Sequence, residues 1–239
     1  MTTNEYEVKI KELFDNWKNK KEINPFISDG IVFPEKYEKP HIMFCLREMN
    51  NDKEGSLCED LNNRGSGWKT WNNASRWVIA LLDRISDYPK YMPKQKRIEQ
   101  LQRISVMNIN KRGGGPHTCG KTLLDAVKRD KKEIIEEIKL CSPNIIICCG
   151  LPSVGVISTA ELLKDYVFEK ELTSDFLLFE SKNINNRRWR YYYTEIEERV
   201  IPVIEFCHPQ VTLLKGNRGH ILFELLYRDM IDIGNQFLK

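Results

Sequence analysis

Polar, potentially reactive residues follow apolar segments that lie far apart in the sequence. Glu48 comes just after one such segment, Asn108 lies near the end of a second, and His208 directly follows a third. The apolar segments are residues 41–46, 104–111, 144–149 and 203–207. Ligands of open α/β sheets bind outside the carboxyl ends of the strands. If these segments are strands of one parallel sheet, Glu48, Asn108 and His208 belong to one shared site.

The three side chains offer a substrate different chemistry. A glutamate can act as a general base, an asparagine amide provides both a donor and an acceptor, and a histidine can donate to developing negative charge. Asn110 points to the same side of a strand as Asn108 and competes for its role. Ordinary structural roles also fit: Glu48 in a surface ion pair, Asn108 in a turn and His208 in a loop.

Two tryptophans and a glycine-rich loop lie next to these segments. Trp68 and Trp71 precede an apolar helical pattern, where they fit either a surface that stacks on a ligand or the hydrophobic core. Gly114 is the middle residue of Gly113–Gly115, which is either a flexible loop or one whose backbone closely approaches a phosphate or sugar. No Gly-Lys-Ser/Thr follows it, so it is not a Walker loop.

Residues 183–193 interleave arginines with aromatic side chains, a pattern typical of nucleic-acid-binding surfaces. The candidate cations are Arg187, Arg188 and Arg190, together with Lys111 from the second apolar segment. The same pattern fits an exposed hairpin whose aromatic residues pack on a sheet. The net charge is only +3, so composition alone does not predict a nucleic-acid partner.

Apolar spacing, together with glycines and prolines, predicts the elements that position these side chains. Helices are expected at residues 4–20, 73–86, 121–140, 152–163 and 217–237. Core strands are expected near 41–46, 104–111, 145–149 and 200–206, with shorter strands at 166–169, 176–179 and 189–194. Residues 51–70, rich in Asn, Gly and Ser, are expected to form a long loop.

The alternation of strands and helices predicts an α/β fold. We expect a three-layer α/β/α sandwich with a mostly parallel four-stranded core sheet and a β-hairpin insertion. Residues 1–239 are expected to form a single domain. Within it, residues 1–39 form an N-terminal helical extension and residues 165–199 form the inserted hairpin region.

Three short motifs follow one another along the chain. They are Asn108-Ile109-Asn110-Lys111, Pro143-Asn144-Ile145-Ile146-Ile147-Cys148-Cys149-Gly150, and His208-Pro209. Their order and spacing resemble the uracil-DNA glycosylase superfamily, and most of all its bacterial and archaeal branch that carries an iron–sulfur cluster. The resemblance covers residues 40–232, and the order of the motifs carries it, because each motif alone is a weak signal.

The resemblance implies hydrolysis of the N-glycosidic bond of uracil or another deaminated base in DNA. By this resemblance, Asn108 recognises the extruded base, His208 stabilises negative charge on the leaving base, and Glu48 positions or activates the attacking water. Trp71, or else Trp68, would stack on the base.

The chain departs from the family's first motif, which has glycines and a proline around the acidic residue. Arg47, Met49 and Asn50 stand there in this chain. Asn50 is therefore the second candidate for the catalytic role of Glu48, and Asp52 is the third. Two alternatives stay open: a catalytically weak or inactive nucleic-acid-binding module, and a nucleoside or nucleotide hydrolase.

Composition narrows the cofactors and partners. The seven cysteines include no CxxC pair, so we expect neither an iron–sulfur cluster nor another metal or cofactor. No apolar run reaches the roughly 20 residues that span a bilayer, and Met1–Tyr6 is polar, so we expect a cytoplasmic protein without a membrane partner. DNA and a small nucleobase or nucleotide are the expected partners, and the sequence does not predict an oligomeric state.

Overall fold

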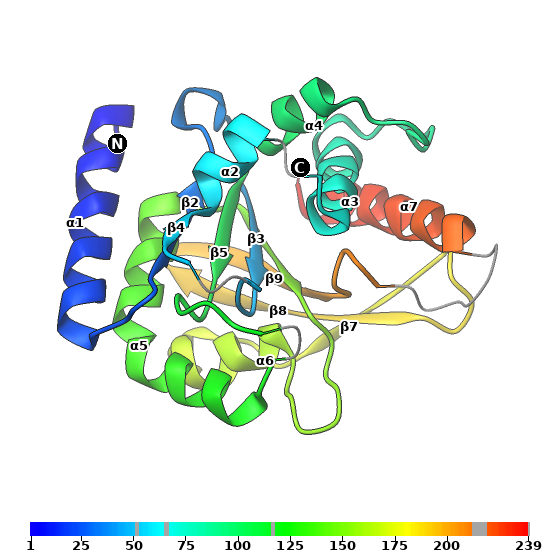
Figure 1. Cartoon of the computed structure of the whole chain (residues 1–239). Coiled ribbons are helices and arrows are strands. Elements are labelled where there is room, and N and C mark those ends of the chain that lie inside the picture. The colour runs from blue at the N-terminus through cyan, green and yellow to red at the C-terminus, as the bar shows by residue number, and fades with distance from the viewer. Residues whose placement is uncertain (51–52, 65–66, 116–117, 212–218, 239) are drawn as a thin grey trace.

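The computed structural model of the protein describes residues 1–50, 53–64, 67–115, 118–211 and 219–238 (Figure 1). Within them, seven strands form one mixed sheet in the order β2-β5-β3-β6-β9-β8-β7. The strands are β2 (Gly30–Ile31), β3 (Ile42–Leu46), β5 (Ser105–Asn108), β6 (Ile145–Cys149), β7 (Leu177–Glu180), β8 (Arg188–Ile196) and β9 (Arg199–Phe206). Two further short strands, β1 (Ile27–Ser28) and β4 (Gly55–Ser56), pair in parallel beside this sheet.

The four central strands β5, β3, β6 and β9 are parallel, which confirms the predicted α/β class with a parallel core. Every residue of β3 and β6 is buried, as expected for parallel strands covered on both faces. The predicted hairpin is part of the same sheet: β8 pairs antiparallel with β9, and β7 with β8. At the opposite edge, β2 pairs antiparallel with β5.

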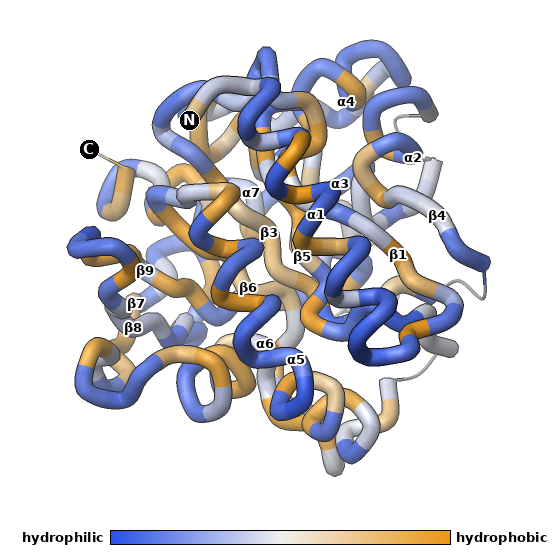
Figure 2. Tube along the Cα trace, turned by 90° about the vertical axis from the view of Figure 1, so that its left-hand side faces the viewer, coloured by the Kyte–Doolittle hydropathy of each residue, from blue (hydrophilic) through white to orange (hydrophobic). Residues whose placement is uncertain are grey.

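Helices cover both faces of the sheet. Alternate residues of β3 point to opposite faces, with Phe44 and Leu46 in one core and Met43 and Cys45 in the other. The first face carries α2 (Leu57–Arg64), α3 (Lys69–Val78), α4 (Lys94–Leu101) and α7 (Gly219–Phe237), and the second carries α1 (Thr3–Lys21), α5 (Gly120–Cys141) and α6 (Thr159–Leu162). In Figure 2, hydrophobic residues run along the central strands.

Residues 1–39 are an integral part of this arrangement. Helix α1 places Tyr6, Phe14 and Trp17 in the same core cluster as α5, and the segment that follows it adds β2 to the sheet. The helix expected as an N-terminal extension is therefore part of the helical layer that also contains α5 and α6. None of the helices in the described ranges is long and apolar enough to cross a membrane.

The expected loop at residues 51–70 is wrong over its described residues, which contain β4 and α2. Leu57 and Leu61 lie one helical turn apart and are both buried, and these two side chains hold α2 against the sheet. The remaining residues of α2 are mostly polar, so the helix has too few apolar positions to show a periodic pattern. Helix α4 was not predicted, for a similar reason.

Two other expected elements also differ from the structure. The helix expected at 152–163 begins only at Thr159, because Ser158 and Glu161 form a capping box that fixes the helix start there. A π-helical turn, Leu163–Val167, follows α6, and it overlaps the strand expected at 166–169. A second π-helical turn, Ile79–Asp83, extends α3. Short 3-10 turns occupy Pro34–Lys36 and Lys170–Leu172.

Candidate active site

Glu48, Asn108 and His208 line one cleft of about 560 Å³. Glu48 comes two residues after β3, Asn108 is the last residue of β5, and His208 comes two residues after β9. All three therefore lie at the carboxyl ends of parallel strands, where ligands of open α/β sheets bind. The prediction that the three residues lie around one cleft is therefore confirmed. Their chemical roles stay predictions. Asn50, Trp68 and Trp71 also line the cleft.

Strand periodicity explains why the three side chains meet. Leu46, Val106 and Phe206 belong to the core on the face of the sheet that carries α3. The residue two positions after each is Glu48, Asn108 or His208, and side chains two apart along a strand share a face. The cleft therefore lies at the sheet edge, beside the start of α3.

Glu48 is held from two sides. Asn110 Nδ2 donates to Glu48 Oε2 at 3.0 Å, and Asn110 Oδ1 accepts from the Arg112 backbone N–H at 3.2 Å. The amide of Asn110 is thus engaged at both ends and supports Glu48, and Asn110 is not among the residues that line the cleft. Its expected contact with a substrate stays a prediction. Gly114 packs directly on the Glu48 carboxyl, since a Cβ at residue 114 would lie 2.5 Å from Glu48 Cδ. Gly114 therefore leaves space for the Glu48 carboxylate. The sequence had predicted that the backbone of this loop approaches a phosphate or sugar, and that contact stays a prediction.

His208 presents its imidazole as a neutral donor. Its Nδ1 accepts a hydrogen bond from the Gln210 backbone N–H at 3.2 Å, so the ring proton resides on Nε2. Burial, together with the nearby charge of Arg47, lowers the pKa of His208 below its ordinary value. Asn73 on α3 fixes the turn by donating to the Pro209 carbonyl at 2.6 Å. No hydrogen bond within the described part of the chain uses Nε2, which leaves it free to donate into the cleft.

Arg47 is a site residue that the sequence reasoning missed. Its Nη2 donates to the backbone carbonyls of Leu151, at 2.7 Å, and Ile157, at 3.2 Å, and so ties the end of β3 to the loop after β6. Gly150 lies against it with a φ of 144°, and a Cβ there would lie 3.1 Å from Arg47 Nε. Gly150, which directly follows the apolar segment 144–149, therefore accommodates the arginine.

Arg47→Gln is expected to raise the pKa of His208. Loss of the neighbouring cation removes one of the two causes that keep the imidazole neutral, so the ring should protonate at a higher pH than in the wild type. An NMR titration of the histidine side chains measures this. The pKa of His41 is lowered by burial and by Lys39 and not by Arg47, so its titration is the internal control. An unchanged His208 midpoint would show that Arg47 does not act on the ring.

The two tryptophans differ in exposure. Trp71 is 4% exposed and belongs to the core beneath α3, while part of it lines the cleft. Trp68 is 48% exposed at the rim. Both the core role and the stacking role therefore fit Trp71, and Trp68 is accessible to a larger molecule that covers the cleft.

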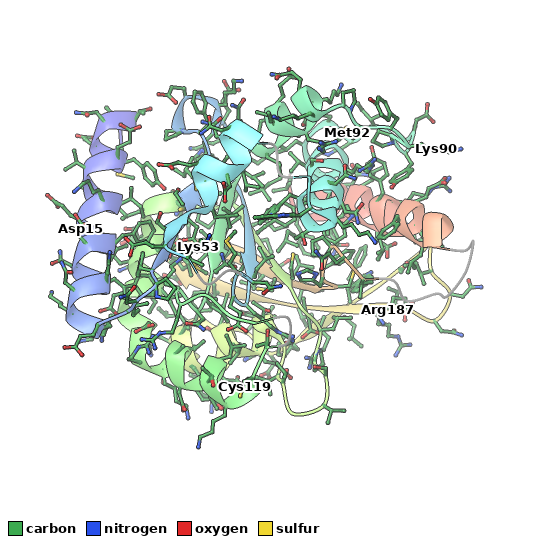
Figure 3. The ribbon with its side chains drawn as sticks, viewed as in Figure 1. Asp15, Lys53, Lys90, Met92, Cys119 and Arg187 are labelled. Atoms are coloured by element: carbon green, nitrogen blue, oxygen red, sulfur yellow. The ribbon has the colours of Figure 1, made fainter. Side chains whose placement is uncertain are left out.

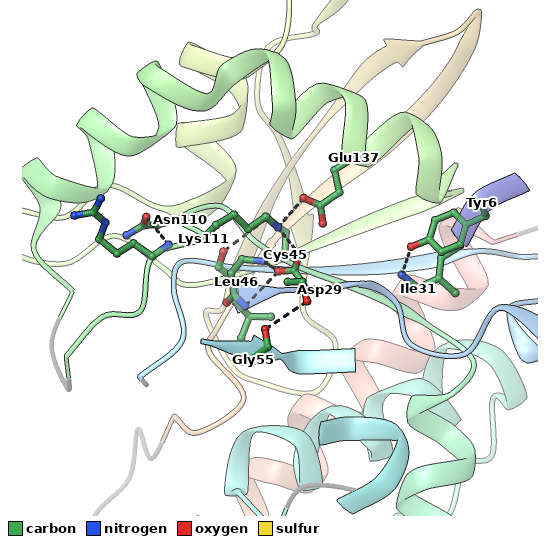
Figure 4. A network of polar contacts seen from close by, with 12 residues as sticks. Tyr6, Asp29, Ile31, Cys45, Leu46, Gly55, Asn110, Lys111 and Glu137 are labelled. Carbon is green, nitrogen blue, oxygen red and sulfur yellow. Dashed lines mark hydrogen bonds and ion pairs between the residues drawn. The ribbon is translucent and has the colours of Figure 1, made fainter. Parts of the chain in front are cut away.

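The predicted nucleic-acid contact of Lys111 is incompatible with its surroundings. The side chain is 0% exposed and forms ion pairs with Asp29 and, at 2.6 Å, with Glu137 (Figure 4). Burial alone would lower the pKa of Lys111, but the two carboxylates raise it above its ordinary value. Lys111 is therefore a buried structural cation beneath the strand end that carries Asn108.

Arg188 and Arg190 lie on β8, Arg187 directly precedes it, and each of the three has a different partner. Arg190 pairs with Glu205 at 2.6 Å and Glu161 at 3.0 Å, which ties it into the sheet. Arg188 pairs with Glu180 at 3.0 Å and stays exposed. The Arg187 guanidinium lies 4.3 Å from the Trp189 ring centre, at the end of the sheet shown in Figure 3.

These arginines lie near the cleft by topology. Since β8 runs antiparallel to β9, the start of β8 lies beside the end of β9 that leads to His208. Arg187 and Arg188 are thus the two cations of this segment that remain near the surface at that edge.

The third candidate for the carboxylate role, Asp52, lies outside the described residues.

The cleft combines a fixed carboxylate, a carboxamide and a neutral imidazole N–H donor. Such a set can accept a proton from water, orient a polar ring and stabilise a developing anion. Comparison with known proteins finds no family model and no curated protein that matches the sequence. Among the described residues, no group of three or more His, Cys, Asp or Glu side chains is arranged to hold a metal ion.

Proposed function

We propose that the protein is a DNA glycosylase that releases uracil or another deaminated base, as its resemblance to the uracil-DNA glycosylase superfamily implies. The observation that carries the proposal is the convergence of Glu48, Asn108 and His208 on one cleft. The parallel core sheet with helices on both faces is compatible with the three-layer sandwich that membership of this superfamily would imply.

In the proposed reaction, the bond between sugar C1′ and the base nitrogen breaks, and its electron pair leaves with the base. His208 Nε2–H donates to the base oxygen on which this charge accumulates, which lowers the barrier. A water oxygen bonds to C1′, and Glu48 accepts the proton that the water loses. Asn108 holds the edge of the extruded base, and Trp71 lies where its ring can stack on the base.

A direct assay tests this function. The protein is incubated with a uracil-containing single-stranded or duplex oligonucleotide, treated with alkali, and examined for strand scission. Scission at the uracil position, absent with a thymine control, is the expected result. A protein that releases no base from any deaminated substrate is not a glycosylase.

One observation favours a second candidate, a nucleic-acid-binding module without efficient chemistry. Arg47 fills the space beside Gly150, in a motif where the family has glycines and a proline. Its guanidinium is bound to the Leu151 and Ile157 carbonyls, so a fixed arginine stands next to Glu48 where the family has small residues. DNA binding without base release would select this candidate, whereas release of uracil from free deoxyuridine, but not from DNA, would select a nucleoside hydrolase.

Glu48→Gln is expected to lower the rate of base release while leaving DNA affinity nearly unchanged. The amide keeps the size and the contact with Asn110 but is no longer a base for the water proton. Single-turnover rates and fluorescence anisotropy measure the two quantities separately. Glu59→Gln, an exposed change on α2, is the matched control. If Glu48→Gln is fully active and Asn50→Ala is not, the role belongs to Asn50.

The double variant Arg187→Ala/Arg188→Ala is expected to weaken DNA binding equally for all sequences. Each lost phosphate contact should also reduce the slope of log affinity against log salt by about 0.7 to 0.9. Binding titrations at several salt concentrations measure both effects. Lys9→Ala/Lys20→Ala, on exposed positions of α1, removes the same charge elsewhere and should leave the slope unchanged. An unaltered slope in the arginine variant would assign this segment a purely structural role.

A further inference from the structure

Asn108 is tied to a carboxylate from a distant part of the chain. Asp29 is 6% exposed and immediately precedes β2, which pairs with β5. Its Oδ2 accepts from the Asn108 backbone N–H at 2.6 Å and from Asn108 Nδ2 at 3.4 Å. One carboxylate oxygen thus contacts both the backbone and the side chain of the residue that lines the cleft.

Asp29 is itself fixed. Its Oδ1 forms an ion pair with Lys111, whose Nζ also contacts Glu137 Oε2 at 2.6 Å (Figure 4). Both Lys111 and Glu137 are fully buried. Both oxygens of the buried Asp29 carboxylate have partners, Oδ1 in Lys111 and Oδ2 in Asn108. The carboxylate therefore has little freedom to rotate, and Oδ2 stays in place as the acceptor that faces Asn108.

This arrangement decides which end of the Asn108 carboxamide faces Asp29. With Nδ2 toward the carboxylate, the contact is a donor to an acceptor. If the amide turned over, Oδ1 would face the carboxylate oxygen, and two acceptors would oppose each other in a buried environment. No described residue donates to Oδ1, so this oxygen and the second N–H of Nδ2 remain for a molecule in the cleft.

A carboxamide in this orientation selects bases by their edge. It offers an acceptor beside a donor, and its complement is a ring N–H beside a carbonyl. Uracil and hypoxanthine present that edge. Cytosine and adenine present the reverse, a bare ring nitrogen beside an amino group, so each would meet donor with donor and acceptor with acceptor. Deamination converts the second kind of edge into the first.

We propose that Asp29, clamped by Lys111, is a specificity-determining positioning residue that fixes the Asn108 carboxamide to read a ring N–H beside a carbonyl. The inference rests on the proposed function for its substrate class, but edge selection does not require catalysis. The cleft would therefore distinguish a deaminated base from its parent through a side chain that never touches the base.

Binding to uncleavable DNA tests the proposal apart from chemistry. Single-stranded oligonucleotides carry one 2′-fluoro-2′-deoxyuridine or one 2′-fluoro-2′-deoxycytidine, which resist loss of the base. The wild type should bind the uracil form roughly tenfold or more tightly, the low end of what one bidentate contact discriminates. Asp29→Asn presents an amide that can offer either end, so this ratio should fall toward one. Asp125→Asn, exposed on α5, should keep the wild-type ratio.

Each result has a defined meaning. A folded Asp29→Asn that keeps the full ratio overturns the inference, as does a wild type that binds both forms equally or binds neither. Selective binding without base release refutes the glycosylase and leaves the inference standing. If Asp29→Asn does not fold, side-chain NMR of the wild type decides. The Asn108 Nδ2 proton should exchange with solvent at least tenfold more slowly than that of exposed Asn16, and equal exchange rates overturn the inference.

Discussion

His208→Ala is expected to slow base release by about 100-fold or more, the usual effect of losing a preorganised donor to a developing anion. The neutral Nε2–H is held toward the cleft by the Gln210 N–H on Nδ1 and by the Asn73 bond to Pro209. Alanine removes this donor without disturbing a hydrogen bond of the sheet. Single-turnover rates on uracil-containing DNA measure the effect.

Two further variants separate the imidazole from its support. Asn73→Ala removes the hydrogen bond to the Pro209 carbonyl. It should slow base release less than His208→Ala does, because the imidazole is still present but no longer fixed. His41→Ala removes an imidazole that stacks on Tyr37, at the opposite end of β3 from the cleft, and should leave the rate nearly unchanged. A His208→Ala rate within threefold of the wild type would contradict the proposed mechanism.

The shared cleft was predictable because local patterns and one topological rule suffice. Each apolar segment is a strand long enough to recognise, and parallel strands bring their carboxyl ends to one edge. Asn108 ends such a strand, and Glu48 and His208 come two residues after the ends of theirs, so the proximity of the three needs no knowledge of loops. The same reasoning predicted that the core strands run parallel, and the amphipathic spacing predicted α1 and α5 nearly to the residue.

The residues that support the site were not predictable in this way. Asp29 lies between two strands of two residues each, which are too short for any periodic pattern, and it reaches Asn108 only because β2 pairs with β5. Arg47 has no sequence neighbour that indicates its contact with the loop after β6. Both contacts arise from the packing of distant segments, which a single sequence does not display.

The burial of Lys111 was not predictable either, because it also depends on contacts with distant segments. This residue stands in the polar stretch Asn110-Lys111-Arg112, where a lysine is ordinarily exposed, and this made a phosphate contact plausible. The two carboxylates that compensate its burial are contributed by the segment before β2 and by α5, far away in sequence. Only the folded chain shows that this cation is enclosed, with the rings of Phe14 and Trp17 near its ammonium group.

Lys111→Met is expected to destabilise the protein by about 3–5 kcal/mol at neutral pH, as removal of one partner of a buried ion pair does. Methionine fills a similar volume but leaves the Asp29 and Glu137 carboxylates buried without their shared cation. Urea unfolding followed by circular dichroism measures the loss. Lys132→Met, exposed on the same helix as Glu137, should stay within about 0.5 kcal/mol of the wild type.

The loss in Lys111→Met should depend on pH in a definite direction. Burial, and then the nearby Asp29 carboxylate, raise the pKa of Glu137 well above its ordinary value, and removal of the cation should raise it further. A carboxyl group whose pKa is higher in the folded than in the unfolded state contributes stability at low pH, and this is lost as pH rises through the interval between the two values. The deficit should therefore be smaller at pH 5 than at pH 7.5. An equal deficit at both values, or one below about 1 kcal/mol, would mean that Lys111 does not neutralise these carboxylates, and the clamp on Asp29 would lose its physical basis.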